Sequence, residues 1–377
     1  MARTLKSDKL LFLATLLLVG TSIVMVYSAS SFLAMSSPKF SPYYFLFKQA
    51  AWAALGLIVL GVTMRVDYRI YKQPVLIWTA LGGVFVALVA VLFMPHINGT
   101  ARWFGVGPVG LQPSEVAKVV LTIFAAALLE RRMHRINEVA YALLPIAIAT
   151  GLFVLLILLE PDFGTSVAII GIVASIIFAA GLSYRYLIGG LVVGAPTLLA
   201  IAWIEPYRRA RIFSFLDPWA HQLGGGYQVV QSLIAIGSGG VFGRGLMAGV
   251  AKQSFLPEPH TDFIGAVIGE ELGLVGITLL IITFCIVAWR GLRAAVLAPD
   301  RFGSLLAIGL TVMVAVQAFF NLSVVTSMMP NKGMPLPFVS NGGSSLLINL
   351  LGMGILLNIS QQSSTVAATK VGVDREA

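Results

Sequence analysis

The sequence predicts an all-α polytopic membrane protein with ten transmembrane helices, and three observations lead to this fold class. Of the 377 residues, 58% are hydrophobic and 11% are charged, with a mean hydropathy of +0.91, whereas soluble domains carry about 25% charged residues. Apolar runs of roughly 20 residues, the length that spans a bilayer, recur along the chain. Positive charges gather on alternate loops. This composition excludes a soluble, disordered or nucleic-acid-binding protein despite the net charge of +9.

Each apolar run is expected to be a helix, because a segment in lipid must pair its own backbone polar groups. The first run follows basic residues, as in a signal peptide, but its length of about 20 residues exceeds the usual 7–15 of such a peptide, so it is read as a retained helix. The middle runs are separated by short loops, the eighth follows two prolines, and the tenth opens from a segment rich in Pro and Gly. The expected helices cover 10–29, 46–64, 75–94, 113–130, 141–159, 165–182, 186–204, 263–289, 303–327 and 338–360.

The distribution of Lys and Arg predicts the orientation. The two termini and every second loop together hold 15 of the 25 basic residues. Because positive charge marks cytoplasmic loops, both termini are expected in the cytoplasm. These residues are Arg3, Lys6, Lys9, Arg65, Arg69, Lys72, Arg131, Arg132, Arg135, Arg185, Arg290, Arg293, Arg301, Lys370 and Arg375.

Residues 205–262 form the long non-membrane segment of this topology, and it is extracytoplasmic. A loop of more than about 15 residues in a compact protein is usually functional or disordered. Glycine clusters at 224–226 and 237–240 flank an amphipathic stretch, YQVVQSLIAI, typical of a short interfacial helix. The pattern favours an ordered, functional loop.

Polar residues gather in four segments, all expected toward the outer face, where ionisable groups at membrane helices are functional candidates. The segments are 98–118 (NGTARWFGVGPVGLQPSEVAK), 160–166 (EPDFGTS), 256–273 (LPEPHTDFIGAVIGEELG) and 330–345 (PNKGMPLPFVSNGGSS). The prolines and glycines of the last segment predict irregular backbone, which is tolerated at membrane depth only where it is buried in protein or lines a cavity.

Asp262 stands where the eighth helix begins. A carboxylate at such a boundary can hold a raised pKa and act as a general base, but Asp is also a common helix cap. Glu270 and Glu271 follow deeper in the helix, where they are expected to be buried and paired. Adjacent acids also suit a proton-coupled transporter, in which Asp162 would join them.

Glu115 and Lys118 are three residues apart at the start of the fourth helix. They form either a structural ion pair or, with Arg102 as a free outer cation, part of a phosphate site. Asp162 either caps the sixth helix through Thr165 or lies in the same polar pocket. The four histidines lack metal-ligand spacing and no GxxxxGK[ST] motif occurs. Carboxylates and phosphate remain compatible with a divalent cation such as Mg²⁺ or Mn²⁺.

Five motifs, in order over nearly the whole chain, resemble the SEDS family (shape, elongation, division and sporulation), the FtsW/RodA/SpoVE group. They are TARWFGVGPVGLQPSEVAK, EPDFGTS, GGGYQVVQSLIAIGSGGVFGRGL, FLPEPHTDFIGAVIGEELGLVG and KGMPLPFVSNGGSSLL. LPEPHTDFI and KGMPLPFVS look nearer to the FtsW branch. One departure is Asn341, where the family usually has an aromatic residue.

The resemblance implies ten transmembrane helices and a peptidoglycan glycosyltransferase that polymerises lipid II outside the bacterial cytoplasmic membrane. It also implies a class B penicillin-binding protein as partner, beside other divisome or elongasome membrane proteins. The family's essential acid maps onto Asp262, the expected catalytic base. A lipid II flippase and a non-catalytic division scaffold are the alternatives. Residues expected to bind substrate are Arg102, Gln112, Ser114, Glu115, Lys118, Asp162, Glu258, His260, Thr261, Lys332 and Ser340.

Overall fold

The protein is described by a computed structural model over residues 7–36, 41–94, 102–106, 109–204, 206–253, 255–331 and 333–376. Each of the ten predicted ranges holds a helix, and the long loop adds the short helices α8 and α9. The helices are α1 (Lys9–Ser36), α2 (Tyr44–Thr63), α3 (Pro74–Val91), α4 (Pro113–Arg132), α5 (Leu144–Leu159), α6 (Phe163–Ala179), α7 (Tyr184–Ile204), α8 (Pro206–Leu216), α9 (Tyr227–Gly239), α10 (Ile264–Val296), α11 (Arg301–Val325) and α12 (Gly343–Glu376). The shorter elements are η1 (Tyr68–Lys72), η2 (Met133–Arg135), the π-helical turn η3 (Val139–Leu143) and the antiparallel strands β1 (Phe104–Val106) and β2 (Val109–Leu111).

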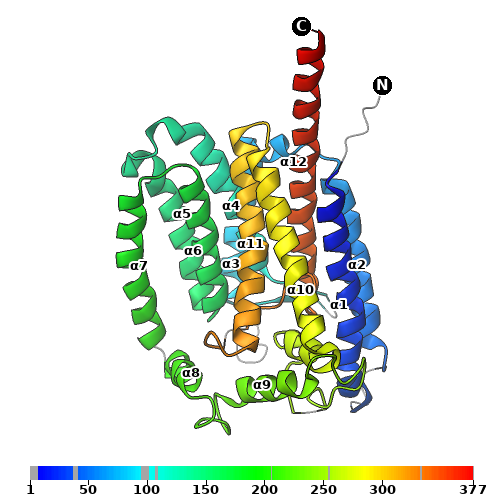
Figure 1. Cartoon of the computed structure of the whole chain (residues 1–377). Coiled ribbons are helices and arrows are strands. Elements are labelled where there is room, and N and C mark those ends of the chain that lie inside the picture. Colours follow the sequence, from blue (N-terminus) through cyan, green and yellow to red (C-terminus); the bar gives the residue numbers. More distant parts are fainter. Residues whose placement is uncertain are drawn as a thin grey trace.

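The long helices form one bundle with two distinct ends (Figure 1). Helix α1 begins and α12 ends at the same end, which we call the terminal end. Helices α8 and α9 lie across the opposite end, which we call the loop end. The long loop therefore contains two helices, and α9 covers the stretch that its amphipathic pattern predicts to be helical.

Seven helices in the described ranges are long and apolar enough to cross a membrane, so the chain is a polytopic helical membrane protein. They are α1, α2, α3, the continuous η3–α5 segment, α10, α11 and the first 21 residues of α12. Helix α6 is apolar but shorter, with 17 residues. Helix α4 carries Glu115 and Lys118 in its first turns and Arg131 and Arg132 in its last.

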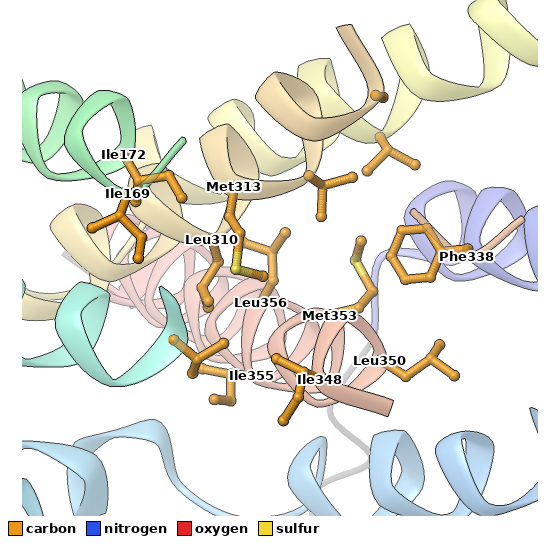
Figure 2. Packing of buried hydrophobic residues seen from close by; sticks show 14 of the residues in the cluster. Ile169, Ile172, Leu310, Met313, Phe338, Ile348, Leu350, Met353, Ile355 and Leu356 are labelled. Atoms are coloured by element: carbon orange, nitrogen blue, oxygen red, sulfur yellow. The ribbon is translucent and has the colours of Figure 1, made fainter. Parts of the chain in front are cut away.

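Helices α11 and α12 are the centre of the bundle. In their most apolar stretches 61% and 78% of residues are buried, against 28% for α2 and α3 at the periphery. Ile169 and Ile172 of α6 meet Leu310 and Met313 of α11, with Leu356 of α12 beside them (Figure 2). This packing joins α6, α11 and α12 in the core of the bundle.

Helix α10 is broken at Gly273, where the sequence predicted a continuous helix. Gly273 has φ 65° and ψ −161°, a conformation that glycine adopts readily because it has no Cβ. The loop residues 240–245 take up the hydrogen bonds that the break releases. Leu274 N–H donates to the Gly240 carbonyl (2.9 Å), while Arg244 N–H donates to the Glu270 carbonyl (2.9 Å). The long loop is thus hydrogen-bonded to the first turns of α10.

The tenth helix begins at Gly343, five residues later than the predicted 338. Residues 334–342 are irregular, as the prolines and glycines predict, and Phe338 has φ 62°. Phe338 and Val339 are nevertheless buried, so this irregular backbone is enclosed by protein. Residues 340 and 341 of this segment form hydrogen bonds with the residues just before α10.

Candidate active site

Asp262 lies two residues before α10, and the residue is half-buried. The N-cap of α10 is Phe263, without a side-chain cap. The carboxylate of Asp262 accepts no hydrogen bond from the residues that the structure describes, whereas its backbone carbonyl does. The interpretation of Asp262 as a helix cap is therefore wrong, and its carboxylate is available for chemistry.

The surroundings of Asp262 raise its pKa to about 7. The largest cause is removal from water by the surrounding protein, followed by the negative charge of Glu258, while Arg211 opposes both. Weaker effects of Asp162 and Arg102 show that these charges lie within electrostatic range. A carboxyl with a pKa near neutrality is suited to accept a proton in a catalytic step.

The first polar segment (98–118) contacts the second (160–166) through side-chain hydrogen bonds. Asp162 caps α6 by accepting hydrogen bonds from the Thr165 backbone N–H (3.1 Å) and hydroxyl (2.8 Å), which confirms its predicted capping role. Gln112, at the start of α4, donates to Asp162 (3.3 Å) and to the buried Ser114 (2.9 Å). Asp162 therefore caps α6 and also contacts the first polar segment through Gln112, while a shared substrate pocket stays a prediction.

Arg102 is not the free cation that the sequence predicted. Its guanidinium donates to the backbone carbonyls of Glu160 (2.8 Å) and Pro161 (2.6 Å). These carbonyls lie in the turn between α5 and α6, and Pro161 has the unusual φ of 31°. Arg102 thus ties the residues before β1 to this turn, and only its charge acts on the neighbouring acids.

Glu160 is a feature that the sequence argument missed. Its side chain is 1% exposed, and both carboxyl oxygens are buried without a hydrogen-bond partner among the described residues. Burial and the charge of Asp162 raise its pKa to about 8, against the opposing effect of Arg102. The only sequence signal was its place in EPDFGTS, two residues before Asp162.

Glu115 and Lys118 form the predicted ion pair, with 2.8 Å between Oε1 and Nζ and side chains 3% and 2% exposed. The second carboxylate oxygen of Glu115 is buried and has no partner in the described part of the chain. The structural interpretation of the pair is confirmed. A contact of Lys118 with phosphate stays a prediction.

The third and fourth polar segments are joined by a ladder of hydrogen bonds. Asn321 of α11 donates to the carbonyls of Asp262 and Met334, both at 2.8 Å. Ser340 donates to the Thr261 carbonyl (2.6 Å) and accepts from Leu336 N–H (2.8 Å). The backbone N–H of Asn341 donates to the His260 carbonyl (2.9 Å). Asn321 was missed, because the run 303–327 reads as a plain apolar helix.

These contacts change the expected roles of several residues. Ser340 is 3% exposed and its hydroxyl is used in the ladder, so it links the two segments, while its contact with substrate stays a prediction. His260 is buried against Phe45, with ring centres 5.0 Å apart, and burial lowers its pKa. Thr261 donates to Glu258, which is exposed and has φ 51°. Lys332 lies outside the described residues.

Glu270 and Glu271 are buried and paired, as expected from their depth. Lys252 of the long loop contacts Glu271 at 2.6 Å, and Ser28 of α1 donates to the same carboxylate at 2.7 Å. Glu270 accepts hydrogen bonds from the backbone N–H groups of Val250 (2.8 Å) and Ala251 (3.2 Å). Both acids therefore hold the loop on α10 and α1.

No group of three or more His, Cys, Asp or Glu residues suited to a metal ion occurs in the part of the chain that the structure describes. The donors that converge at the loop end are carboxylates, amides and hydroxyls. This donor set fits a hard cation only if a ligand supplies further oxygens.

Comparison with known proteins agrees with this arrangement. The profile of the FtsW/RodA/SpoVE family, described as cell cycle proteins, matches residues 8–365. A Geobacter sp. (strain M18) protein named probable peptidoglycan glycosyltransferase FtsW is 38% identical over 94% of this chain and 96% of its own length. Stage V sporulation protein E of Bacillus subtilis is 40% identical, over 94% and 97%.

Solved structures show the same fold. One, from work on the structural coordination of polymerization and crosslinking by a peptidoglycan synthase complex, matches with a TM-score of 0.78 and 31% identity, over 95% of this chain and 99% of that one. The rod shape determining protein RodA of Thermus thermophilus matches with a TM-score of 0.69 and 28% identity, over 95% and 98%. This chain therefore belongs to the FtsW/RodA/SpoVE family.

Proposed function

We propose that this protein is a peptidoglycan glycosyltransferase in which Asp262 is the general base. Relatives that carry this activity in their names cover nearly the whole chain at 38–40% identity. The observation that carries the assignment of the base is the place of Asp262, a half-buried residue whose carboxylate accepts no hydrogen bond from the described residues. The third and fourth polar segments meet there, and the charges of the first two lie within electrostatic range.

The proposed reaction joins two lipid-linked disaccharides of the lipid II type. The Asp262 carboxylate accepts the proton of the acceptor's sugar hydroxyl as that oxygen bonds to the donor's anomeric carbon. The bond from this carbon to the pyrophosphate breaks, and polyprenyl pyrophosphate leaves with the bonding electrons. Positioning of the two substrates and stabilisation of the leaving charge would supply most of the acceleration.

Positive charge for the leaving group comes from Arg102 and Lys118 in this proposal. Arg102 acts through its charge, held in place by its two carbonyl contacts. A Mg²⁺ or Mn²⁺ ion would accompany the pyrophosphate, since Mg²⁺ is usually held by one or two carboxylates together with substrate phosphates. Asp162, within electrostatic range of Asp262, is the carboxylate that we expect to face it.

The transporter alternative is less well supported. It requires acids along a passage between the two membrane faces, but Glu270 and Glu271 are engaged with Lys252, Ser28 and backbone amides. A scaffold would not require an available carboxylate such as Asp262. We also propose ten spans in the bacterial cytoplasmic membrane, both termini inside, and a class B penicillin-binding protein as partner with other divisome or elongasome proteins.

The test of the base is Asp262→Asn, assayed as glycan-chain formation from lipid II by the purified protein, alone and with its transpeptidase partner. General-base catalysis contributes about 10²–10⁴-fold, so the rate should fall at least 100-fold with unchanged thermal stability. The control is Asp217→Asn, an exposed acid of the long loop that caps a turn at Ala220. A near wild-type rate for Asp262→Asn would remove the residue from the mechanism.

The topology has its own test. Leu223, in the turn between α8 and α9, is 96% exposed, so Leu223→Cys in a Cys285→Ser background should react with an impermeant thiol reagent in intact cells. Labelling only after lysis would place the loop end in the cytoplasm and overturn the orientation.

A further inference from the structure

The backbone of Asp262 is fixed by one buried amide. Both hydrogens of the Asn321 side-chain nitrogen are used, one on the Asp262 carbonyl and one on the Met334 carbonyl, at 2.8 Å each. Asn321 is 2% exposed, and it sits on the central helix α11. A carbonyl removed from water and left without its donor destabilises the fold, so this amide holds the two segments together.

Gly333 lies against the other side of the same residue. A Cβ added to Gly333 would be 2.9 Å from Oδ2 of Asp262 and 3.9 Å from its Cγ, and apart from the chain neighbours it would meet no other described atom within 4 Å. The φ of Gly333 is not in the left-handed region, and the residue is exposed. Neither its conformation nor packing against other residues therefore requires glycine there. Among the described residues, only the Asp262 carboxylate has free space because Gly333 lacks a side chain.

We infer that Asn321 and Gly333 set the geometry of the base: Asn321 is a positioning residue that fixes the Asp262 backbone, and Gly333 leaves the space through which the acceptor hydroxyl reaches Oδ2. The inference rests on the proposed role of Asp262. The hydroxyl passes its proton to Oδ2 while its oxygen bonds to the anomeric carbon and the pyrophosphate leaves with the electron pair. A methyl group at 333 occupies the approach to Oδ2.

The expected size of both effects follows from orientation. A displacement of about 1 Å at a reacting group can lower a rate roughly 100-fold. Gly333→Ala should therefore reduce kcat by about 10- to 100-fold, with KM for lipid II within about twofold of wild type. Its thermal stability should be unchanged, because the added methyl meets only the side chain of the half-buried Asp262.

Matched controls are present in the same elements. Gly342→Ala lies in the same irregular segment, but its Cβ would make ordinary contacts, 3.6 Å to Ser345 and 3.9 Å to Pro335, so kcat should stay near wild type. For Asn321→Leu the control is Gln317→Leu, four residues earlier on α11 and 3% exposed, which has no hydrogen bond to Asp262 or Met334 among the described residues.

The experiment measures kcat, KM, the pH profile and thermal stability of the purified full-length protein with lipid II. Asn321→Leu should lower kcat by 10- to 100-fold and displace the acid limb of the profile that reports Asp262, whereas Gln317→Leu should leave the limb in place. Asn321→Gln, which keeps the amide, should recover part of the rate.

Two outcomes separate the inference from the proposed function. If Asp262→Asn abolishes polymerisation while Gly333→Ala and Asn321→Leu retain wild-type kcat, the inference is wrong and the base assignment stands. If Asp262→Asn polymerises normally, the base assignment itself fails. Equal losses in Gly333→Ala and Gly342→Ala, or losses explained by a lower melting temperature, would also overturn the inference.

Discussion

Acidic residues at the two ends of the bundle have pKa values shifted in opposite directions. At the terminal end, Asp300 accepts hydrogen bonds from Gly303 N–H (2.8 Å), the Tyr68 hydroxyl (2.7 Å) and the Arg69 guanidinium (2.8 Å). Burial alone would raise the pKa of Asp300, but these donors outweigh it and hold the pKa below its ordinary value. At the loop end, Asp262 and Glu160 have no comparable donors among the residues that the structure describes, and their pKa values rise to about 7 and about 8.

This difference separates structural charges from reactive ones. A carboxylate surrounded by donors is stabilised as an anion and has little tendency to take a proton. A carboxyl held in a poorly solvated place without donors is poised to exchange a proton near neutral pH. Asp300 at the terminal end is therefore held as a structural anion, whereas the raised pKa of Asp262 at the loop end fits the proposed proton acceptor.

The largest expected effect lies in the buried pair that holds the long loop, which, like Glu115–Lys118, is a structural ion pair at the loop end. Lys252→Met leaves Glu271 buried without its cation, and breaking such a pair costs about 3–5 kcal/mol. We expect a lower melting temperature in detergent and loss of polymerisation. Lys252→Met/Glu271→Gln removes both charges and should restore most of the stability. A double variant as unstable as the single one would contradict this.

The pH dependence of polymerisation is the next test. A base must be deprotonated, so the rate should rise with pH through about 7, the raised pKa of Asp262, and level off above it. Glu258 raises this pKa through its charge, so Glu258→Gln should move the acid limb to lower pH. Glu138→Gln, an exposed acid paired with Arg135, is the control and should leave the limb in place. An acid limb at the same pH in Glu258→Gln and wild type would show that Glu258 does not raise the pKa of Asp262.

The helices and polar segments of the loop end were predictable from the sequence, because each is marked by residues close together in the chain. Apolar length located ten helices, and polar residues interrupting apolar runs located all four segments. Proline and glycine spacing predicted the irregular backbone before Gly343. Depth in the helix predicted the pairing of Glu270 and Glu271, though not with which residues.

The rest depended on contacts between distant residues. Arg102 looks free in the sequence, and only the fold brings the Glu160 and Pro161 carbonyls to it. Asn321 is one amide in an apolar run. Its role is visible only in the fold, where the carbonyls of Asp262 and Met334 both accept hydrogen bonds from it. The break at Gly273 has no local sign beyond one glycine, because its partners lie some thirty residues earlier in the long loop.

A moderate effect is expected at the terminal end. Tyr68→Phe removes a hydrogen bond to the charged Asp300, worth about 1.5–3 kcal/mol. Since the pKa of Asp300 is lowered in the folded protein, its contribution to stability is present above its ordinary value of 3.8 and is lost as the pH falls through the folded pKa. The variant should be less stable near neutrality and lose less on acidification, while kcat of the folded protein is unchanged. A change in kcat would contradict the separation of the two ends.

The smallest effect is expected for Lys72→Met, the exposed counterpart of Lys252→Met. Lys72 and Glu130 are 3.2 Å apart, but their side chains are 37% and 22% exposed, so water solvates both charges. Such pairs contribute about 0–1 kcal/mol, and the loss is further reduced by salt. The backbone carbonyl of Lys72 still accepts a hydrogen bond from Arg131, so the local fold is retained. Thermal unfolding of both variants, measured side by side in detergent, should give a large shift for Lys252→Met and almost none for Lys72→Met. Equal shifts would show that burial at the loop end does not strengthen its ion pair.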